Sequence, residues 1–218
     1  MLIFGKIAKL PTDGVPMFLF YNAGLAIWNF FNGCFGSTSG AFSNNAGIFG
    51  KVYFPRLIMP IASIISSLIK FGIQFSLFVL VYFYMIGFVG YHPVIGRGLI
   101  LLPFDLFLIA GIAFGFGIIV SSVTTKYRDI NQLVGFGMQL LMYATPIVYS
   151  FAKLSPHLKE YLSVNPLVAP VESFKYALFG VGDFSFGTLM YSTVWMLALL
   201  FFGLMLFNRA EKNFMDIV

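Results

Sequence analysis

Long stretches of the chain carry no charged side chain, and this pattern dominates the sequence. The windows without Asp, Glu, Lys or Arg cover residues 14–50, 71–96, 130–152 and 184–208. An ionised group costs at least about 2.5 kcal/mol at the centre of a bilayer. About 20 apolar residues in a helix cross roughly 30 Å of hydrocarbon, and lipid offers no partner to open backbone groups. The pattern predicts five transmembrane helices, at about 17–38, 60–86, 99–123, 131–149 and 187–207.

Five crossings place the two ends of the chain on opposite sides of the membrane. The loop cations divide six against six between the two sides, so their number does not decide the orientation. The set that includes Lys51, Arg56 and Arg128 lies in short loops close to span ends, where positive charge is the better guide to the cytoplasmic side. This favours a cytoplasmic location for these loops.

Residues 150–183 fit neither a plain loop nor a span. The segment mixes charged side chains with many apolar ones, and Pro156, Pro166 and Pro170 divide it into short pieces because proline interrupts helices. Short amphipathic pieces beside a membrane lie in its interface or dip back into space lined by protein. We therefore expect two short helices folded over the outer mouth.

The composition supports a membrane protein and excludes other classes. The 218 residues are 59% hydrophobic and only 10% charged, with a mean hydropathy of +0.91, whereas soluble domains carry about a quarter charged residues. The net charge of +5 is scattered rather than clustered, which argues against a nucleic-acid partner. Cys34 is the single cysteine, so no internal disulfide forms. We expect an all-α membrane protein.

The stretch "GKVYFPRL", residues 50–57, is a polar island between apolar runs. Ser43 is a candidate N-cap, and the residue before Pro55 disfavours helical geometry, so a short helix should end at Phe54. About ten residues are too few for a stable helix in water. The helix therefore needs either the membrane surface, with Lys51 and Arg56 snorkelling, or the groove of another protein. The residues alone leave both open.

Three further sets of residues are candidates for function. In the loop 124–132, Arg128 and Asp129 either pair with each other, cap span ends or contact a partner. Lys70 and Asp105 are the charges inside the predicted spans. One hypothesis is that they form an ion pair between the second and third spans and line or gate a pore. The other is that each side chain snorkels to the membrane interface. Gly111 and Gly115 form a G-x-x-x-G that favours close helix packing.

Signatures of enzymes and nucleotide binding are missing from the sequence. It contains neither H-E-x-x-H nor G-x-x-x-x-G-K-[ST], and His92 and His157 are isolated. We expect no metal site, no catalytic residue and no cofactor bound by this chain. If ATP drives the protein, a separate subunit must supply it.

At this point the residues resemble a known family. The run "GLAIWNFFNGCFGSTSGAFSNNAGIFGKVYFPRLIMPIASIISSLIKF" is similar to the second span, cytoplasmic loop and third span of ABC type-2 exporter permeases, most of all the class that exports polysaccharides (O-antigen, teichoic acid and capsule). Trp28 in the span before "KVYFPR" and Pro60 at the start of the next follow the family pattern. The later segments "KYRDI", "TPIVY", "NPL", "VESFKYAL" and "AEKNFMDIV" appear in the family's order.

The resemblance implies one permease domain over residues 1–218, with a coupling loop (39–59), an outer gate region (150–183) and a cytoplasmic tail (208–218). It implies a homodimer with a channel between two copies, each bound to a separate ATPase subunit that holds ATP and Mg, in the bacterial inner membrane. The implied substrate is a lipid-linked polysaccharide. The implied ATPase-coupling residues are Lys51, Val52, Tyr53, Phe54, Pro55, Arg56, Arg128 and Asp129. The candidate gate or channel residues are Glu172, Asn165, Pro166, Lys70, Asp105 and Trp28.

The sequence departs from the family pattern at two places. Family members have six spans after an amphipathic helix, whereas "FGKIAKLPTDGVPMFLF" resembles the loop after the first span, so the chain looks like a member without its first span. Lys70 stands where family members often carry an acidic residue. Three alternatives remain open: an exporter of drugs or small lipids, a membrane-embedded transferase acting on lipid-linked sugars, and a remnant without function.

Overall fold

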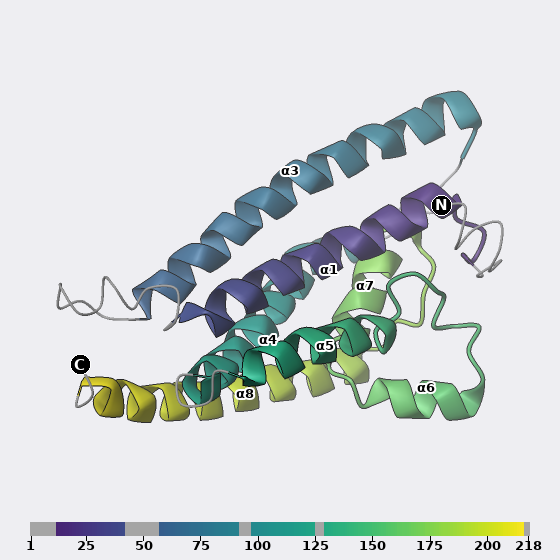
Figure 1. Ribbon diagram of the computed structural model, residues 1–218. Helices are drawn as coiled ribbons and strands as arrows, with labels where there is room; N and C mark the ends of the chain where they lie inside the picture. Colours follow the sequence, from purple (N-terminus) through teal and green to yellow (C-terminus); the bar gives the residue numbers. More distant parts are fainter. Residues whose placement is uncertain (1–11, 42–56, 92–96, 125–128, 216–218) are drawn as a thin grey trace.

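The described part of the chain folds into a bundle of helices (Figure 1). The computed structural model describes residues 12–41, 57–91, 97–124 and 129–215, with the side chains of these residues as far as Arg209 except that of Arg97. Within these ranges the regular elements are all helical, which confirms the predicted all-α class. They are α1 (Met17–Ser39), α3 (Ile58–Val89), the short 3-10 helix η2 (Arg97–Ile100), α4 (Leu101–Thr124), α5 (Ile130–Tyr143), α6 (Pro156–Ser163), α7 (Val168–Phe179) and α8 (Phe186–Met215).

The five long helices run back and forth along one direction. Figure 1 shows the last residues of α1 and α8 and the first residues of α3 and α5 at one end of the bundle. The start of α1, the end of α3, and the short helices α6 and α7 lie at the opposite end. The helix ends that flank the loop predicted to couple to an ATPase therefore lie opposite the region predicted to form the outer gate.

Three of the predicted spans coincide with helices that are long and apolar enough to cross a membrane. These are Ile58–Val89, Gly98–Thr124 and Phe186–Arg209, found within the described residues. Helix α1 has nearly the predicted bounds of 17–38, but the three asparagines and the small polar residues of its sequence lower its hydropathy, and it is not one of the three. The all-helical membrane fold is confirmed, whereas the number of crossings stays a prediction.

The predicted span 131–149 is only partly helical. Helix α5 ends at Tyr143, and residues 144–149 form turns. Pro146 explains the early end, because proline lacks an amide hydrogen and disfavours helical geometry at the residue before it. Fourteen residues rise about 21 Å, less than the roughly 30 Å of hydrocarbon.

Helix α4 lies at the centre of the bundle, between α1, α7 and α8. A Cβ atom added to Gly115 would lie 2.7 Å from the carbonyl carbon of Leu199 in α8, and one added to Gly203 would lie 2.8 Å from the oxygen of Gly115. Gly111 likewise faces Met196 of α8. The predicted role of Gly111 and Gly115 in close helix packing is therefore confirmed.

The outward faces of α3 and α8 are exposed and largely apolar. Only 17% of the most apolar window of α3 is buried, and 22% of that of α8. On α3 the exposed side chains include Ile61, Ile65, Ile69, Ile73, Leu77 and Leu80. A continuous apolar surface of this extent is costly in water but suits lipid. These faces therefore identify the outer surface of a membrane protein.

Candidate functional site

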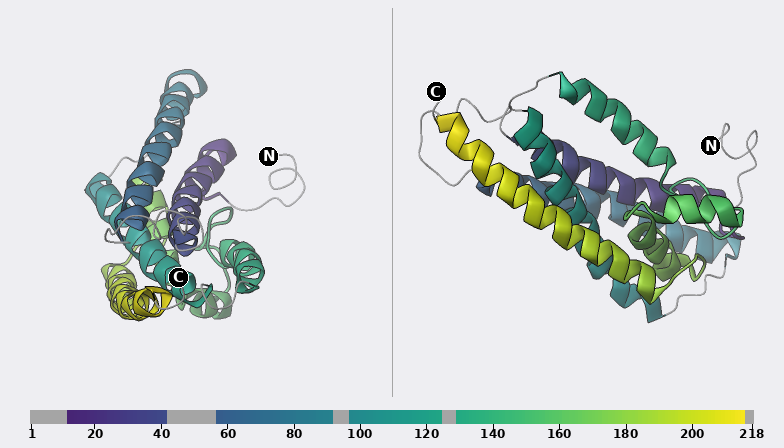
Figure 2. Two further views of the ribbon diagram at one scale, coloured as in Figure 1. Left: turned by 60° about the vertical axis from the view of Figure 1, so that its left-hand side comes forward. Right: turned by 90° about the horizontal axis from the view of Figure 1, so that it is seen from below.

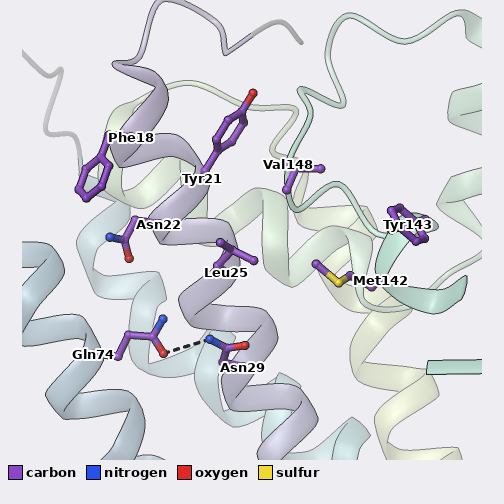
Figure 3. A pocket seen from close by; sticks show the side chains of 9 residues that line it. All are labelled: Phe18, Tyr21, Asn22, Leu25, Asn29, Gln74, Met142, Tyr143 and Val148. Carbon is purple, nitrogen blue, oxygen red and sulfur yellow. Dashed lines mark hydrogen bonds between the residues drawn. The ribbon is translucent and has the colours of Figure 1, made fainter. Parts of the chain in front are cut away.

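A groove whose lining includes several carboxamide side chains runs along α1 and faces α5. It consists of two adjoining cavities of about 390 and 500 Å³, which share Met142, and we call them together the α1–α5 groove. Figure 3 shows the first cavity. The residues lining the groove are Phe18, Tyr21, Asn22, Leu25, Trp28, Asn29, Asn32, Phe35, Gly36 and Ser39 of α1, Gln74 of α3, Asn131, Val134, Gly135, Met138, Gln139, Met142 and Tyr143 of α5, and Val148.

One stripe of α1 faces the groove. The positions 18, 22, 25, 29, 32, 36 and 39 alternate in steps of four and three, a spacing that keeps residues on one face of a helix. Most other residues of α1 are buried against α3, α4 and α7. Leu25, Asn29 and Asn32 are exposed within this stripe. Helix α1 thus has a packed apolar face and a second face rich in carboxamides.

The carboxamides of the groove have few partners in the protein. Asn29 donates a hydrogen bond from Nδ2 to Oε1 of Gln74 at 3.4 Å, drawn in Figure 3. Within the described residues, no hydrogen bond is made by the side chains of four others: Asn22, Asn32, Asn131 and Gln139. Polar groups facing hydrocarbon without a partner are costly. The groove is therefore suited to a polar occupant.

Trp28, a predicted channel residue, lies in the wall of this groove. Its ring is 7% exposed and packs 5.3 Å from the ring of Phe31. Tyr21, Phe35 and Tyr143 also line the groove. Phe18 and Tyr143 are the exposed aromatic residues of this lining, whereas Trp28, Tyr21 and Phe35 are buried in its wall.

A buried ion pair holds α7 at the end of the bundle where α1 begins. Glu172 Oε1 and Lys175 Nζ are 3.2 Å apart, and both side chains are almost fully buried. Lys175 also donates to the carbonyl oxygens of Pro146 and Tyr149, and its Nζ lies 4.2 Å from the ring centroid of Phe20 in α1. Burial raises the pKa of Glu172 and lowers the pKa of Lys175, and the opposite charge of each partner offsets this effect.

The gate candidates Asn165 and Pro166 join three elements beside this pair. Asn165 Nδ2 donates to Ala144 O at 3.2 Å and to Thr145 Oγ1 at 3.0 Å, while its Oδ1 accepts from the amide of Leu167 at 3.0 Å. The carbonyl of Pro166 accepts from Ser192 Oγ of α8 at 2.7 Å. Asn165 and Glu172 also border a small cavity of about 40 Å³. The structure thus brings Asn165, Pro166 and Glu172 close together, and their role in a gate stays a prediction.

The hypothesis of an ion pair between Lys70 and Asp105 is wrong. Asp105 is fully buried on α4 beside Ser173 of α7, and neither of its oxygens has a hydrogen-bond partner within the described chain. Lys70 is exposed on α3. Helix α3 packs mainly on α1, with little contact to α4, so its exposed face does not reach Asp105. Neither residue lines the α1–α5 groove.

Most of the predicted coupling residues lie outside the described part of the chain. This holds for Lys51, Val52, Tyr53, Phe54, Pro55, Arg56 and Arg128. Asp129 is described: it is exposed, and its carbonyl accepts a hydrogen bond from the amide of Gln132 at 3.2 Å. It precedes α5 at the end of the bundle where α1 ends and α3 begins (Figure 1).

The apolar exterior is that of a multi-pass membrane protein, and the α1–α5 groove places carboxamide side chains between two of its helices. Comparison with known protein families agrees with a membrane protein. The family model described as ABC-2 type transporter matches residues 1–179. The chain therefore belongs to the ABC-2 family of membrane transport permeases.

Similar individual proteins carry a more specific name. Two proteins of Klebsiella pneumoniae, each named "O-antigen export system permease protein RfbA", are 26% and 24% identical to the chain, over 99% of its length and 80% of theirs. A protein of the same name from Myxococcus xanthus is 22% identical over 80% of the chain and 65% of its own length.

Proposed function

We propose that the chain is the permease subunit of an ATP-driven exporter that moves a lipid-linked polysaccharide across the bacterial inner membrane. The observation that carries the proposal is the α1–α5 groove with its carboxamides, in a chain whose relatives over 99% of its length are named O-antigen export permeases. Aromatic rings and carboxamides are the side chains that suit a sugar, because a sugar ring has apolar faces and a rim of hydroxyl groups.

In this proposal a separate ATPase subunit binds ATP and Mg on the cytoplasmic side, and a second copy of the chain completes the channel. Lys51, Val52, Tyr53, Phe54, Pro55 and Arg56, together with Arg128 and Asp129, form the surface that contacts the ATPase. The C-terminus is then cytoplasmic as well, since α8 ends at the same end of the bundle as α1. This chain itself performs no covalent chemistry.

Helix α1 supplies a physical link between the two ends. Its last turn precedes the predicted coupling loop in the chain, and its first half contacts α7 and the residues Glu172 and Lys175, which we call the outer cluster. Phe20 lies under the ammonium group of Lys175, and Gly24 is in close contact with the carbonyl of Ile147. A shift of α1 driven by the ATPase would therefore move the outer cluster of α7 and open or close the groove.

The proposal is tested by weakening the coupling surface. The double variant Arg56→Glu with Phe54→Ala should no longer co-purify the ATPase subunit and should lose glycan display on the cell surface, because it reverses one charge and removes one aromatic anchor. His157→Glu with Tyr161→Ala is the matched control, since both residues are exposed on α6 at the opposite end. If both doubles retain the ATPase and display glycan equally, the coupling role is wrong.

A further inference from the structure

The lining of the α1–α5 groove is free of charge. Among the residues that line it, as far as the structure describes them, none is Asp, Glu, Lys or Arg. Its polar groups are six carboxamides, two tyrosine hydroxyls, one serine and the indole of Trp28. The carboxamides are Asn22, Asn29, Asn32, Gln74, Asn131 and Gln139.

We infer that this groove selects an uncharged polysaccharide over an anionic one, with the carboxamides of α1 and α5 binding the sugar hydroxyls. The inference rests on the proposed function and adds the chemical class of the substrate. A carboxamide has two donors and an acceptor, and a hydroxyl is both donor and acceptor, so each can satisfy the other in either direction. Four of the six carboxamides are unpaired within the described residues and available for such bonds.

The absence of charged side chains from the described lining of the groove supports the inference as much as the carboxamides do. A polysaccharide with uronate or phosphate groups brings negative charges, and proteins bind these groups with Arg or Lys. A charge without a counter-ion at membrane depth costs several kcal/mol. Lys175 is the cation near the groove's outer end, but it is buried and already engaged by Glu172 and two carbonyl groups. The groove thus offers an anionic repeat no compensating charge.

The geometry of α1 extends the recognition over more than one sugar. Asn22, Asn29 and Asn32 lie on the same stripe, and with a rise of 1.5 Å per residue they span about 15 Å along the helix. Asn131 and Gln139 face the groove from α5. Carboxamides from two helices along this length suit a linear chain of sugars, whereas an acyl chain of a lipid would leave them unpaired.

The test uses the full chain with its ATPase subunit in cells that lack their own exporter. One strain makes a polysaccharide of neutral hexoses, and a second makes a polymer containing uronic acid on the same lipid carrier. Surface display should favour the neutral polymer by about tenfold or more. A tenfold ratio corresponds to a difference of about 1.4 kcal/mol in binding free energy between the two polymers. Equal display of both polymers, or preference for the acidic one, overturns the inference while the proposed function stands. Display of neither overturns the proposed function and the inference with it.

Variants then assign the selectivity to the carboxamides. Asn29→Leu with Asn32→Leu should lower display of the neutral polymer by about tenfold, because two groups that bond hydroxyls are lost. The matched control, Ser66→Leu with Ser76→Leu, removes two polar groups from exposed positions of α3 outside the groove and should leave display unchanged. Asn32→Lys should shift the ratio of displayed polymers toward the acidic one. If the leucine pair behaves like its control, a helix rather than a glycan fills the groove and the inference fails.

Discussion

Helices α4 and α5 follow one another in the chain, yet the bundle uses them in opposite ways. Helix α4 is buried along much of its length, with Leu108, Ile112 and Ala113 packed in the core and Gly115 against the backbone of α8. Helix α5 has a single buried residue, Met138. Figure 2 shows α5 set apart from the neighbouring helices in the view from below.

The comparison separates a scaffold from a surface that receives a solute. The packed half of the bundle consists of α4, α7, α8 and the apolar face of α1, and its buried charges and close glycine contacts fix one arrangement. The groove half consists of α5 and the polar stripe of α1, where carboxamides lack partners within the described residues. Substitutions in the packed half should change stability, and substitutions in the groove should change transport.

The largest effect on stability is expected at the buried ion pair. Lys175→Met leaves Glu172 without its partner and should lower the free energy of unfolding by about 3–5 kcal/mol. Thermal unfolding in detergent, followed by fluorescence, measures the change. Lys153→Met is the control, because this lysine pairs with Asp13 at 3.4 Å but is 54% exposed, and such surface pairs contribute little. The double variant Glu172→Leu with Lys175→Met should unfold at a higher temperature than Lys175→Met alone, and a lower one would contradict this account of the pair.

A smaller effect is expected at the contact between α4 and α8. Gly115→Ala places a methyl group within 2.7 Å of the Leu199 carbonyl carbon, and such overpacking destabilises by about 1–3 kcal/mol. Gly137→Ala in α5 meets nothing within 4 Å, and alanine favours a helix by about 1 kcal/mol over glycine. Unfolding temperatures of the two variants should therefore shift in opposite directions. Equal shifts would show that α4 is packed no more tightly than α5.

The smallest effect on stability is expected from single asparagines. Asn165→Ala removes hydrogen bonds that join α5 to the start of α7 and should cost about 1 kcal/mol, with faster amide exchange in residues 144–149. Asn131→Ala in the groove removes a side chain with no described hydrogen-bond partner and should leave the unfolding temperature unchanged. Hydrogen exchange with mass spectrometry distinguishes the two variants. A larger effect of Asn131→Ala than of Asn165→Ala would show that Asn131 belongs to the packed half of the bundle.

The sequence predicts the helices well where the energetic signal is local. Charge-free windows located α8 and most of α3, and a long apolar run with Asp105 as its single charge located α4, because the cost of a charge in lipid acts on each residue separately. The early end of α5 was missed although Pro146 is visible in the sequence. A prediction from charge-free windows takes no account of residues that interrupt a helix. Because the residues after Tyr143 carry no charge and are mostly apolar, the predicted span continued past the end of α5.

Contacts between distant segments were harder to predict. The pairing of Lys70 with Asp105 was wrong because hydropathy does not tell which way a helix faces. The outer region was correctly divided into two short helices, but the burial of Glu172 and Lys175 depends on the carbonyl groups of Pro146 and Tyr149. The stripe of Asn22, Asn29 and Asn32 was visible as helical spacing in an apolar run. That this stripe forms one wall of a groove could be inferred only after the structure placed α5 opposite it.

Site-specific photo-crosslinking tests the central claim, that the α1–α5 groove carries the polysaccharide. A benzophenone amino acid at Gln139 or Asn32 should crosslink glycan during export in the presence of the ATPase subunit, because both side chains line the groove. The same photo-reactive residue at Ile69 of α3 or Phe201 of α8, both exposed on apolar faces, should crosslink lipid and no glycan. Glycan attached at Ile69 or Phe201, with none at Gln139 or Asn32, would contradict the account.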